Sequence, residues 1–168
     1  MEGLWIPKEI LQLGGATHTE MFILSVYHYY TVNGDKHCCT LTNKQVAEIT
    51  LTGERTVQRC KAKYKKLLHI SGNITKWFPA KVEDINNLLK DDRLDDAITM
   101  LCKCISAGLL EDATRVKYFN KLLAYINDTY YGDKHIQIYK DFNERYDDVI
   151  RKVKKVNNAW GDTDGRVG

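Results

Sequence analysis

The chain has 168 residues, of which 43% are hydrophobic and 28% are charged, and only two are proline. This composition supplies enough apolar side chain for a packed core and excludes a wholly disordered chain. No stretch approaches the roughly 18 consecutive apolar residues of a membrane span, and the N-terminus lacks the basic start and apolar block of a secretory signal. We therefore expect a cytoplasmic protein, with its five cysteines reduced because none shows ligand or redox spacing.

Charge is distributed unevenly along the chain. Residues 1–80 carry ten Lys and Arg against six Asp and Glu, residues 81–150 carry ten against fourteen, and residues 151–168 carry five against two. The three segments therefore have net charges of +4, −4 and +3. A basic front beside an acidic middle favours one localised nucleic-acid surface, with the acidic part facing away from phosphate.

The first forty residues predict a short helix followed by a longer one. Pro7 separates a brief extended piece from one or two helical turns. Thr17 and Glu20 have the spacing of a capping box, which predicts the start of a helix of about three turns. The sequence Asn33-Gly34-Asp35 indicates a turn after it.

Residues 42–70 predict two helices joined by a tight turn. Thr42 is the expected cap of the first helix, and Thr52 is the expected cap of the second, which we expect to end near Leu68. The second helix has an inward apolar face formed by Val57, Cys60, Tyr64 and Leu67. Its opposite side carries Arg55, Gln58, Arg59, Lys65 and Lys66.

Two β-prone pieces around Gly72-Asn73 predict a hairpin that ends at Pro79. A hairpin directly after a basic helix is typical of the wing of a winged helix-turn-helix domain, which we assign to residues 1–79. Residues 80–160 show no strand signal. They predict a helical bundle with helices near 82–89, 94–107, 112–132 and 134–158, and residues 161–168 predict a disordered tail.

The last predicted helix carries a long apolar stripe. Its members recur at steps of three or four residues, and they are Ile138, Phe142, Tyr146, Val149, Val153 and Val156. This spacing suits a bundle helix and a dimer seam equally well. The predicted fold class is therefore mainly α, with a winged helix-turn-helix domain followed by an all-α region for dimerisation or partner binding.

The basic helix carries the residue types that read DNA. Arg pairs with guanine and Gln with adenine through two hydrogen bonds, so Arg55, Gln58 and Arg59 are the base-reading candidates. Residues 53–66 hold six cations against one acid, which makes an ordinary solubilising surface the weaker interpretation. Further candidate DNA contacts are Thr42, Asn43, Thr52, Thr56, Lys61, Lys63, Lys65, Lys66 and, in the predicted wing, Lys76 with its neighbour Trp77.

Patterns for catalysis or metal binding are missing from the sequence. It contains neither GxxxxGK[ST] nor GxGxxG, the loops that cradle nucleotide phosphates. Its five histidines never form the His-hydrophobe-His pair of rolling-circle initiators, and His37-Cys38-Cys39 lacks a second ligand pair at zinc spacing. We predict a protein that is not an enzyme and needs no cofactor or metal.

Three segments resemble the winged-helix domain of phage and plasmid replication-initiator, or replisome-organiser, proteins. They read WIPKEIL, THTEMFIL and TNKQVAEITLTGERTVQRCKAKYKKLLHI. In the last segment, Thr42-Asn43 matches the family's helix cap and Val46-Ala47 its second-helix core, while Thr52 and residues 55–59 match the recognition helix. The resemblance covers residues 4–78 and implies sequence-specific binding of double-stranded DNA in replication initiation or organisation.

Two other functions stay open. Helices of the RTVQR type also occur in bacterial transcriptional regulators, so a repressor is one alternative. The other is a protein-interaction adaptor or inhibitor that uses a winged-helix scaffold without touching DNA. The expected partners are double-stranded DNA, a second copy of the chain through its C-terminal helices, and a replication or transcription protein, with no membrane involved.

Overall fold

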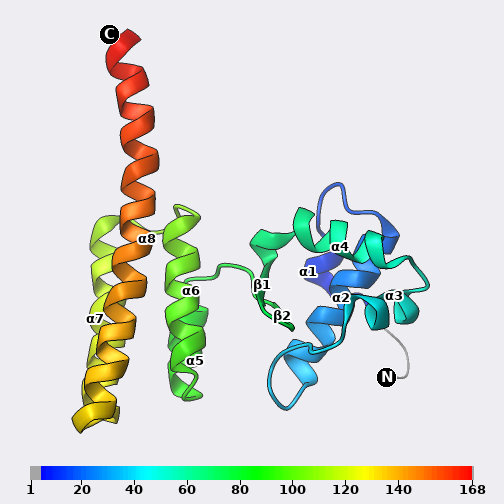
Figure 1. Cartoon of the computed structure of the whole chain (residues 1–168), viewed down its shortest axis with the longest axis horizontal. Coiled ribbons are helices and arrows are strands. Elements are labelled where there is room, and N and C mark those ends of the chain that lie inside the picture. Colours follow the sequence, from blue (N-terminus) through cyan, green and yellow to red (C-terminus); the bar gives the residue numbers. More distant parts are fainter. Residues whose placement is uncertain (1–4, 168) are drawn as a thin grey trace. The chain divides into compact units, whose positions relative to one another are not determined.

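The computed structural model describes the backbone of residues 5–167 and the side chains of residues 5–155. These residues form eight α-helices, one 3-10 turn and one antiparallel two-stranded sheet, so the protein is mainly α (Figure 1). The chain divides into two compact units, Met1–Pro79 and Ala80–Gly168. In the part of the chain that is described, no helix is long and apolar enough to cross a membrane.

Unit 1 is built around helix α2 (His18–Asn33), which begins at the predicted capping box. The Thr17 hydroxyl accepts a hydrogen bond from the Glu20 amide at 3.1 Å, and the Glu20 carboxylate accepts one from the Thr17 amide at 2.9 Å. The buried residues of α2 run from Ile23 to Tyr27. They pack in a core shared with α1 (Lys8–Leu11), α3 (Asn43–Thr50), α4 (Glu54–Lys63) and β2 (Ile74–Trp77).

Helices α3 and α4 are joined by residues 51–53. Thr42 caps α3 as predicted, in a capping box with Gln45. Leu51 ends α3 in the left-handed conformation, with a φ of 56°. The next amide, that of Thr52, then donates back to the Ala47 carbonyl at 2.9 Å. Thr52 therefore belongs to the end of α3, and the prediction that it caps α4 is wrong.

Gly53 is the residue that caps α4, and it supplies no side-chain hydrogen bond. The helix ends at Lys63 and not near Leu68 as predicted. A 3-10 turn, η1 (Lys65–Leu67), follows it and leads into strand β1 (Leu68–Ser71). The helix stops early because Leu68 has to be extended to pair with Trp77, which places both side chains in the core.

The predicted hairpin is confirmed, with β1 pairing antiparallel to β2 from Leu68↔Trp77 to Ser71↔Ile74. The two-residue turn between the strands contains Gly72 at a φ of 58°, a conformation that glycine adopts without steric cost. The other edge of β2 is occupied as well. Cys39 forms an isolated bridge with Thr75 through two hydrogen bonds of 2.8 and 2.9 Å, which the sequence pattern did not predict.

Trp77 is a core residue, which overturns its prediction as a wing contact to DNA. Its side chain is 8% exposed, and its ring centroid lies 5.9 Å from that of His28. The Trp77 amide donates a 2.9 Å hydrogen bond to the Thr31 hydroxyl. The inward face of the hairpin is therefore used to hold it against α2.

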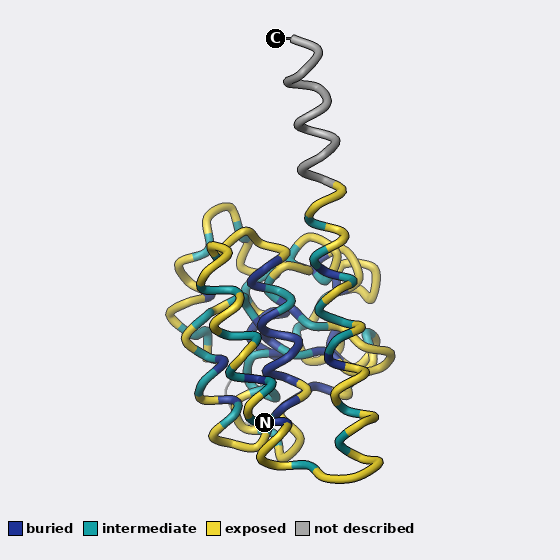
Figure 2. Tube along the Cα trace, turned by 90° about the vertical axis from the view of Figure 1, so that its left-hand side faces the viewer, coloured by how far each residue is buried: buried dark blue, intermediate teal, exposed yellow. Residues whose placement is uncertain are grey.

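Unit 2 contains helices α5 (Asp84–Lys90), α6 (Leu94–Ser106), α7 (Asp112–Thr129) and α8 (Gly132–Val167), so all four predicted helices are present. Helix α6 is the core of this unit, since nine of its thirteen residues are buried and it packs against the other three helices (Figure 2). A polar bridge also joins α6 to α8, where the Arg145 guanidinium donates to Asp95 at 2.7 Å and to the Thr99 hydroxyl at 2.6 Å.

The apolar stripe of α8 serves the bundle of its own unit. Phe142 is fully buried and stacks on Phe119 of α7 with ring centroids 4.9 Å apart, and Val149 is 7% exposed. A dimer formed through this stripe would have to displace these contacts, so dimerisation stays a prediction. The predicted disordered tail, residues 161–168, lies beyond the residues whose side chains are described, although the backbone of α8 extends to Val167.

Candidate nucleic-acid interface

Helix α4 has a buried face and an exposed basic face. Val57 and Cys60 are at most 2% exposed, and the Cys60 thiol donates a weak hydrogen bond to the Glu20 carbonyl at 3.9 Å. A helical repeat of 3.6 residues then directs the predicted base-reading residues away from the core. All three are exposed, and they are Arg55, Gln58 and Arg59.

The exposed face of α4 carries a small side chain near its C-terminal end, one residue before the helix ends at Lys63. Ala62 is exposed one turn after Arg59, and it is the smallest side chain that a helix surface can carry without glycine. A small residue at this point lets another surface approach the helix backbone closely. Arg55, Gln58 and Ala62 therefore form an exposed surface suited to insertion in a groove.

Lys61 and Asn43, two predicted DNA contacts, are bonded to each other. The Lys61 ammonium donates a 3.2 Å hydrogen bond to the Asn43 amide oxygen and lies 5.8 Å from the centroid of the Tyr27 ring. Burial lowers the pKa of Lys61. These contacts give both residues a part in joining α4 to α3 and to the core.

The remaining predicted contacts surround the basic face unevenly. Thr42 is exposed, but its hydroxyl is used in the cap of α3. Lys65 and Lys66 are exposed on η1, just beyond the end of α4. Lys76 is half-buried in β2, opposite His69, and the exposed hairpin tip that follows β1 is uncharged.

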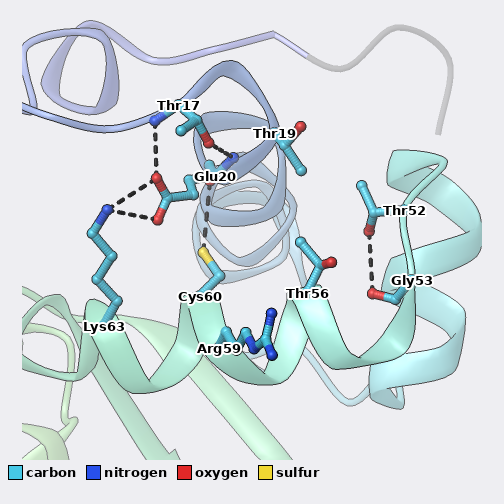
Figure 3. Close-up of a pocket in the computed structure, with 9 residues that line it drawn as sticks. All are labelled: Thr17, Thr19, Glu20, Thr52, Gly53, Thr56, Arg59, Cys60 and Lys63. Carbon is cyan, nitrogen blue, oxygen red and sulfur yellow. Dashed lines mark hydrogen bonds and ion pairs between the residues drawn. The ribbon is translucent and has the colours of Figure 1, made fainter.

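A hollow of approximately 460 Å³ lies between α4 and the start of α2 (Figure 3). Arg59 and Lys63 line it from α4, and hydroxyl groups line it from both helices. Six of its nine lining residues come from the predicted recognition helix, and they are Thr52, Gly53, Thr56, Arg59, Cys60 and Lys63. The sequence carries no signal for this hollow, because the spacing of Thr17 and Glu20 indicates only the start of a helix.

Glu20 and Lys63 form an ion pair at one end of the hollow. The Lys63 ammonium lies 3.0 and 3.1 Å from the two Glu20 carboxylate oxygens. Burial raises the pKa of Glu20, but the hydrogen bond from the Thr17 amide and the contact with Lys63 outweigh it, and the pKa is lowered overall. The hydrogen bond to Glu20 raises the pKa of Lys63, so both partners are charged at neutral pH.

Comparisons with protein-family models, curated proteins and solved structures gave no match. Among the described residues, no three His, Cys, Asp or Glu side chains lie together as a metal-binding group. What α4 and its surroundings offer is a set of hydrogen-bond donors and cations on one side of unit 1. Such a set can bind phosphate groups and the edges of bases.

Proposed function

We propose that unit 1 is a winged helix-turn-helix domain that binds double-stranded DNA in a sequence-specific manner. Helix α4 is the recognition helix and enters the major groove. In this proposal Arg55 pairs with guanine and Gln58 with adenine, while Lys65 and Lys66 contact phosphates at the end of the helix. The protein performs no chemistry on the DNA and acts through binding alone.

The observation that carries this proposal is the amphipathic division of α4. Val57 and Cys60 fix the helix to α2, and the same rotation leaves Arg55 and Gln58 exposed beside the small Ala62. A groove-reading helix needs such a fixed orientation, because its side chains have to meet base edges at defined positions.

The order of elements around α4 also supports the proposal. Helix α2, the bridging residue Cys39, helices α3 and α4, and the hairpin β1–β2 follow one another along the chain, with β2 between Cys39 and β1. This is the arrangement expected of a winged helix, in which a short strand after the first helix pairs with the wing. The wing of this chain has an uncharged tip, so we assign most of the phosphate binding to α4 and η1.

The biological setting that we propose is replication initiation or organisation of a phage or plasmid type. It rests on the resemblance of residues 4–78 to initiator domains. Unit 2 would then recruit a replication protein or join two copies of the chain.

Binding to random duplex DNA at increasing salt tests the proposal. Neutralising about three to five phosphates predicts a slope of log K against log salt of roughly −3 to −4.5. Selection from a randomised duplex pool should then enrich one sequence. Arg55→Ala should weaken binding to that sequence by about 1–3 kcal/mol and change binding to random duplex much less.

The charge-matched control is Lys36→Gln, which removes an exposed cation of the loop after α2. It should affect specific and random duplex alike, and only weakly. Absence of binding at low salt, or binding with a flat salt dependence, would contradict the proposal and favour the adaptor alternative.

A further inference from the structure

The hollow beside α4 combines positive charge with hydroxyl groups in a way that the base-reading face does not. Arg59 lines it, with its guanidinium over α4 between Cys60 and Thr56, and none of the described acidic side chains pairs with this guanidinium (Figure 3). Thr56 also lines the hollow, and within the described residues its hydroxyl makes no hydrogen bond, whereas the Thr19 hydroxyl is directed away from α4 (Figure 3). A guanidinium and a free hydroxyl are donors that match the oxygens of a phosphate group.

The position of the hollow matches the path of a DNA strand that borders a groove-bound helix. It lies along the flank of α4, next to the exposed row that contains Arg55. When a helix lies in the major groove, the phosphates at the groove edges run along its flanks. Arg59 is therefore better placed for phosphate than for a base edge.

The ion pair at the end of the hollow involves a second cation, Lys63, which lines the same hollow as Arg59. Lys63 is about half exposed, and its ammonium is bound to a carboxylate that is only 14% exposed. The carboxylate itself is fixed by the capping box at Thr17. Glu20 thus neutralises a cation that could otherwise contact phosphate.

We propose that this hollow holds one backbone phosphate of the bound duplex, bound by Arg59 and Thr56, and that Glu20 reduces DNA affinity by restraining Lys63. This inference rests on the proposed DNA binding and adds two elements to it. Arg59 becomes a phosphate contact, and DNA affinity is limited by an acid that also caps α2.

The central variant is Glu20→Gln, which removes the charge and keeps the cap. A glutamine at this position of a capping box still accepts the hydrogen bond from the Thr17 amide, so the start of α2 is preserved. Released Lys63 adds one phosphate contact. The salt slope for random duplex should therefore steepen by about 0.9, and affinity at 0.1 M salt should rise roughly three- to eightfold.

The matched control is Asp35→Asn, which removes an exposed acid just after the other end of α2. A helix of 16 residues places that end about 24 Å from the hollow. Its effect on affinity should be less than twofold at 0.1 M salt, since charges separated by more than about 10 Å are screened. A gain equal to that of Glu20→Gln would overturn the role of Glu20.

A double-mutant cycle isolates the action through Lys63. In a Lys63→Gln background, Glu20→Gln should raise affinity by less than half of its gain in the wild type on a logarithmic scale. An undiminished gain would mean that Glu20 does not act by restraining Lys63, and it would overturn that part of the inference.

The phosphate itself is located with duplexes that carry a single neutral methylphosphonate in place of one phosphate. One position on the selected site should weaken binding of the wild type, have little further effect on Arg59→Gln, and weaken binding of Thr56→Val less than that of the wild type. Arg59→Gln should also weaken specific and random duplex equally. A loss confined to the specific sequence would make Arg59 a base contact and overturn the phosphate site.

These outcomes are separable from failure of the proposed function. If the wild type does not bind duplex DNA, DNA binding itself is refuted. If it binds and the variants at the hollow behave like their controls, the phosphate site alone is refuted.

Discussion

At Gly53, one side chain is expected to change the stability of α4 and the affinity for DNA in opposite directions. It is the N-cap of α4, where it offers no side-chain oxygen to the exposed amides of the first turn. Its backbone is extended, with a φ of −87°, and a Cβ placed there would meet nothing closer than the Thr56 hydroxyl at 3.9 Å. A polar side chain would therefore fit without strain.

Gly53→Asp should stabilise the fold and weaken DNA binding. An acidic N-cap can accept a hydrogen bond from the Thr56 amide and interacts favourably with the helix dipole, which predicts a gain of about 0.3–1 kcal/mol in unfolding free energy. The same charge lies at the edge of the hollow, where it repels phosphate. Thermal unfolding and duplex binding measure the two effects.

Gly53→Ser is the control for this prediction, because serine caps a helix equally well without charge. It should give a similar gain in stability and leave DNA affinity within about twofold. Weaker binding by both variants would show that the cap position needs glycine for close approach of the DNA, and that charge is not the cause.

Residue-level features were predictable where their partners are near in sequence. The start of α2 was predicted from the capping-box spacing of Thr17 and Glu20, and the start of α3 from Thr42 as a cap residue, because both signals are local. The cap of α4 was missed by one residue, because its position depends on the left-handed turn at Leu51. No local pattern signals that turn, since leucine rarely adopts it.

Helix α6 carries a partly buried lysine, Lys103, whose charged form is disfavoured by burial. Burial lowers the pKa of Lys103 from an ordinary value of 10.5 to about 8. Between these values the unfolded chain still holds the proton that the folded chain has lost. The contribution of Lys103 to folding therefore becomes more favourable as the pH rises from about 8 to 10.5, and it is least favourable below pH 8.

Lys103→Met should stabilise unit 2 at pH 7 by roughly 1–2 kcal/mol, a value reduced for the partial exposure of the side chain. The advantage of the variant should shrink as the pH rises through the same window. Urea unfolding of both proteins at pH 7, 8.5 and 10 measures it. A constant difference across this range would contradict the lowered pKa.

Stability has to be compared between the wild type and Lys103→Met. Buried thiols lower the stability of the folded chain at high pH, where deprotonated Lys103 raises it. Burial raises the pKa of Cys104 to about 11 and that of Cys60 to about 12. The folded chain keeps these protons after the unfolded chain has lost them, so stability falls as the pH rises above about 9. Both proteins share the thiols, and the difference between them cancels this effect.

Elements were predicted well, and the contacts between distant elements were not. The helical spacing of apolar residues predicted all the helices of unit 2, because each helix has its own buried apolar stripe. The bridge from Cys39 to Thr75 joins residues 36 positions apart, and the hollow joins α2 to α4. Such features depend on how the core packs, and a single sequence carries no periodic signal for them.

Across the whole molecule, the two units differ in charge. Residues 1–79 contain ten Lys and Arg against six Asp and Glu, and residues 80–168 contain fifteen against sixteen. Each unit has its own buried core, around α2 in the first and α6 in the second. Each unit should therefore fold alone when the chain is divided between Pro79 and Ala80, and DNA binding should remain with unit 1.

A fragment of residues 1–79 should fold and bind random duplex with the salt slope of the full chain, because every cation assigned to DNA lies within it. A fragment of residues 80–168 should fold and not bind at 0.15 M salt, since its net charge of −1 gives no general attraction to phosphate. Circular dichroism of each fragment establishes folding before binding is compared.

If unit 2 also joins two copies, light scattering should show a dimer for the full chain and for residues 80–168. The full chain should then bind a two-fold repeated site about 100-fold or more tighter than the short fragment does. A folded fragment 1–79 that fails to bind random duplex, beside a full chain that binds it, would contradict the assignment of the interface to α4.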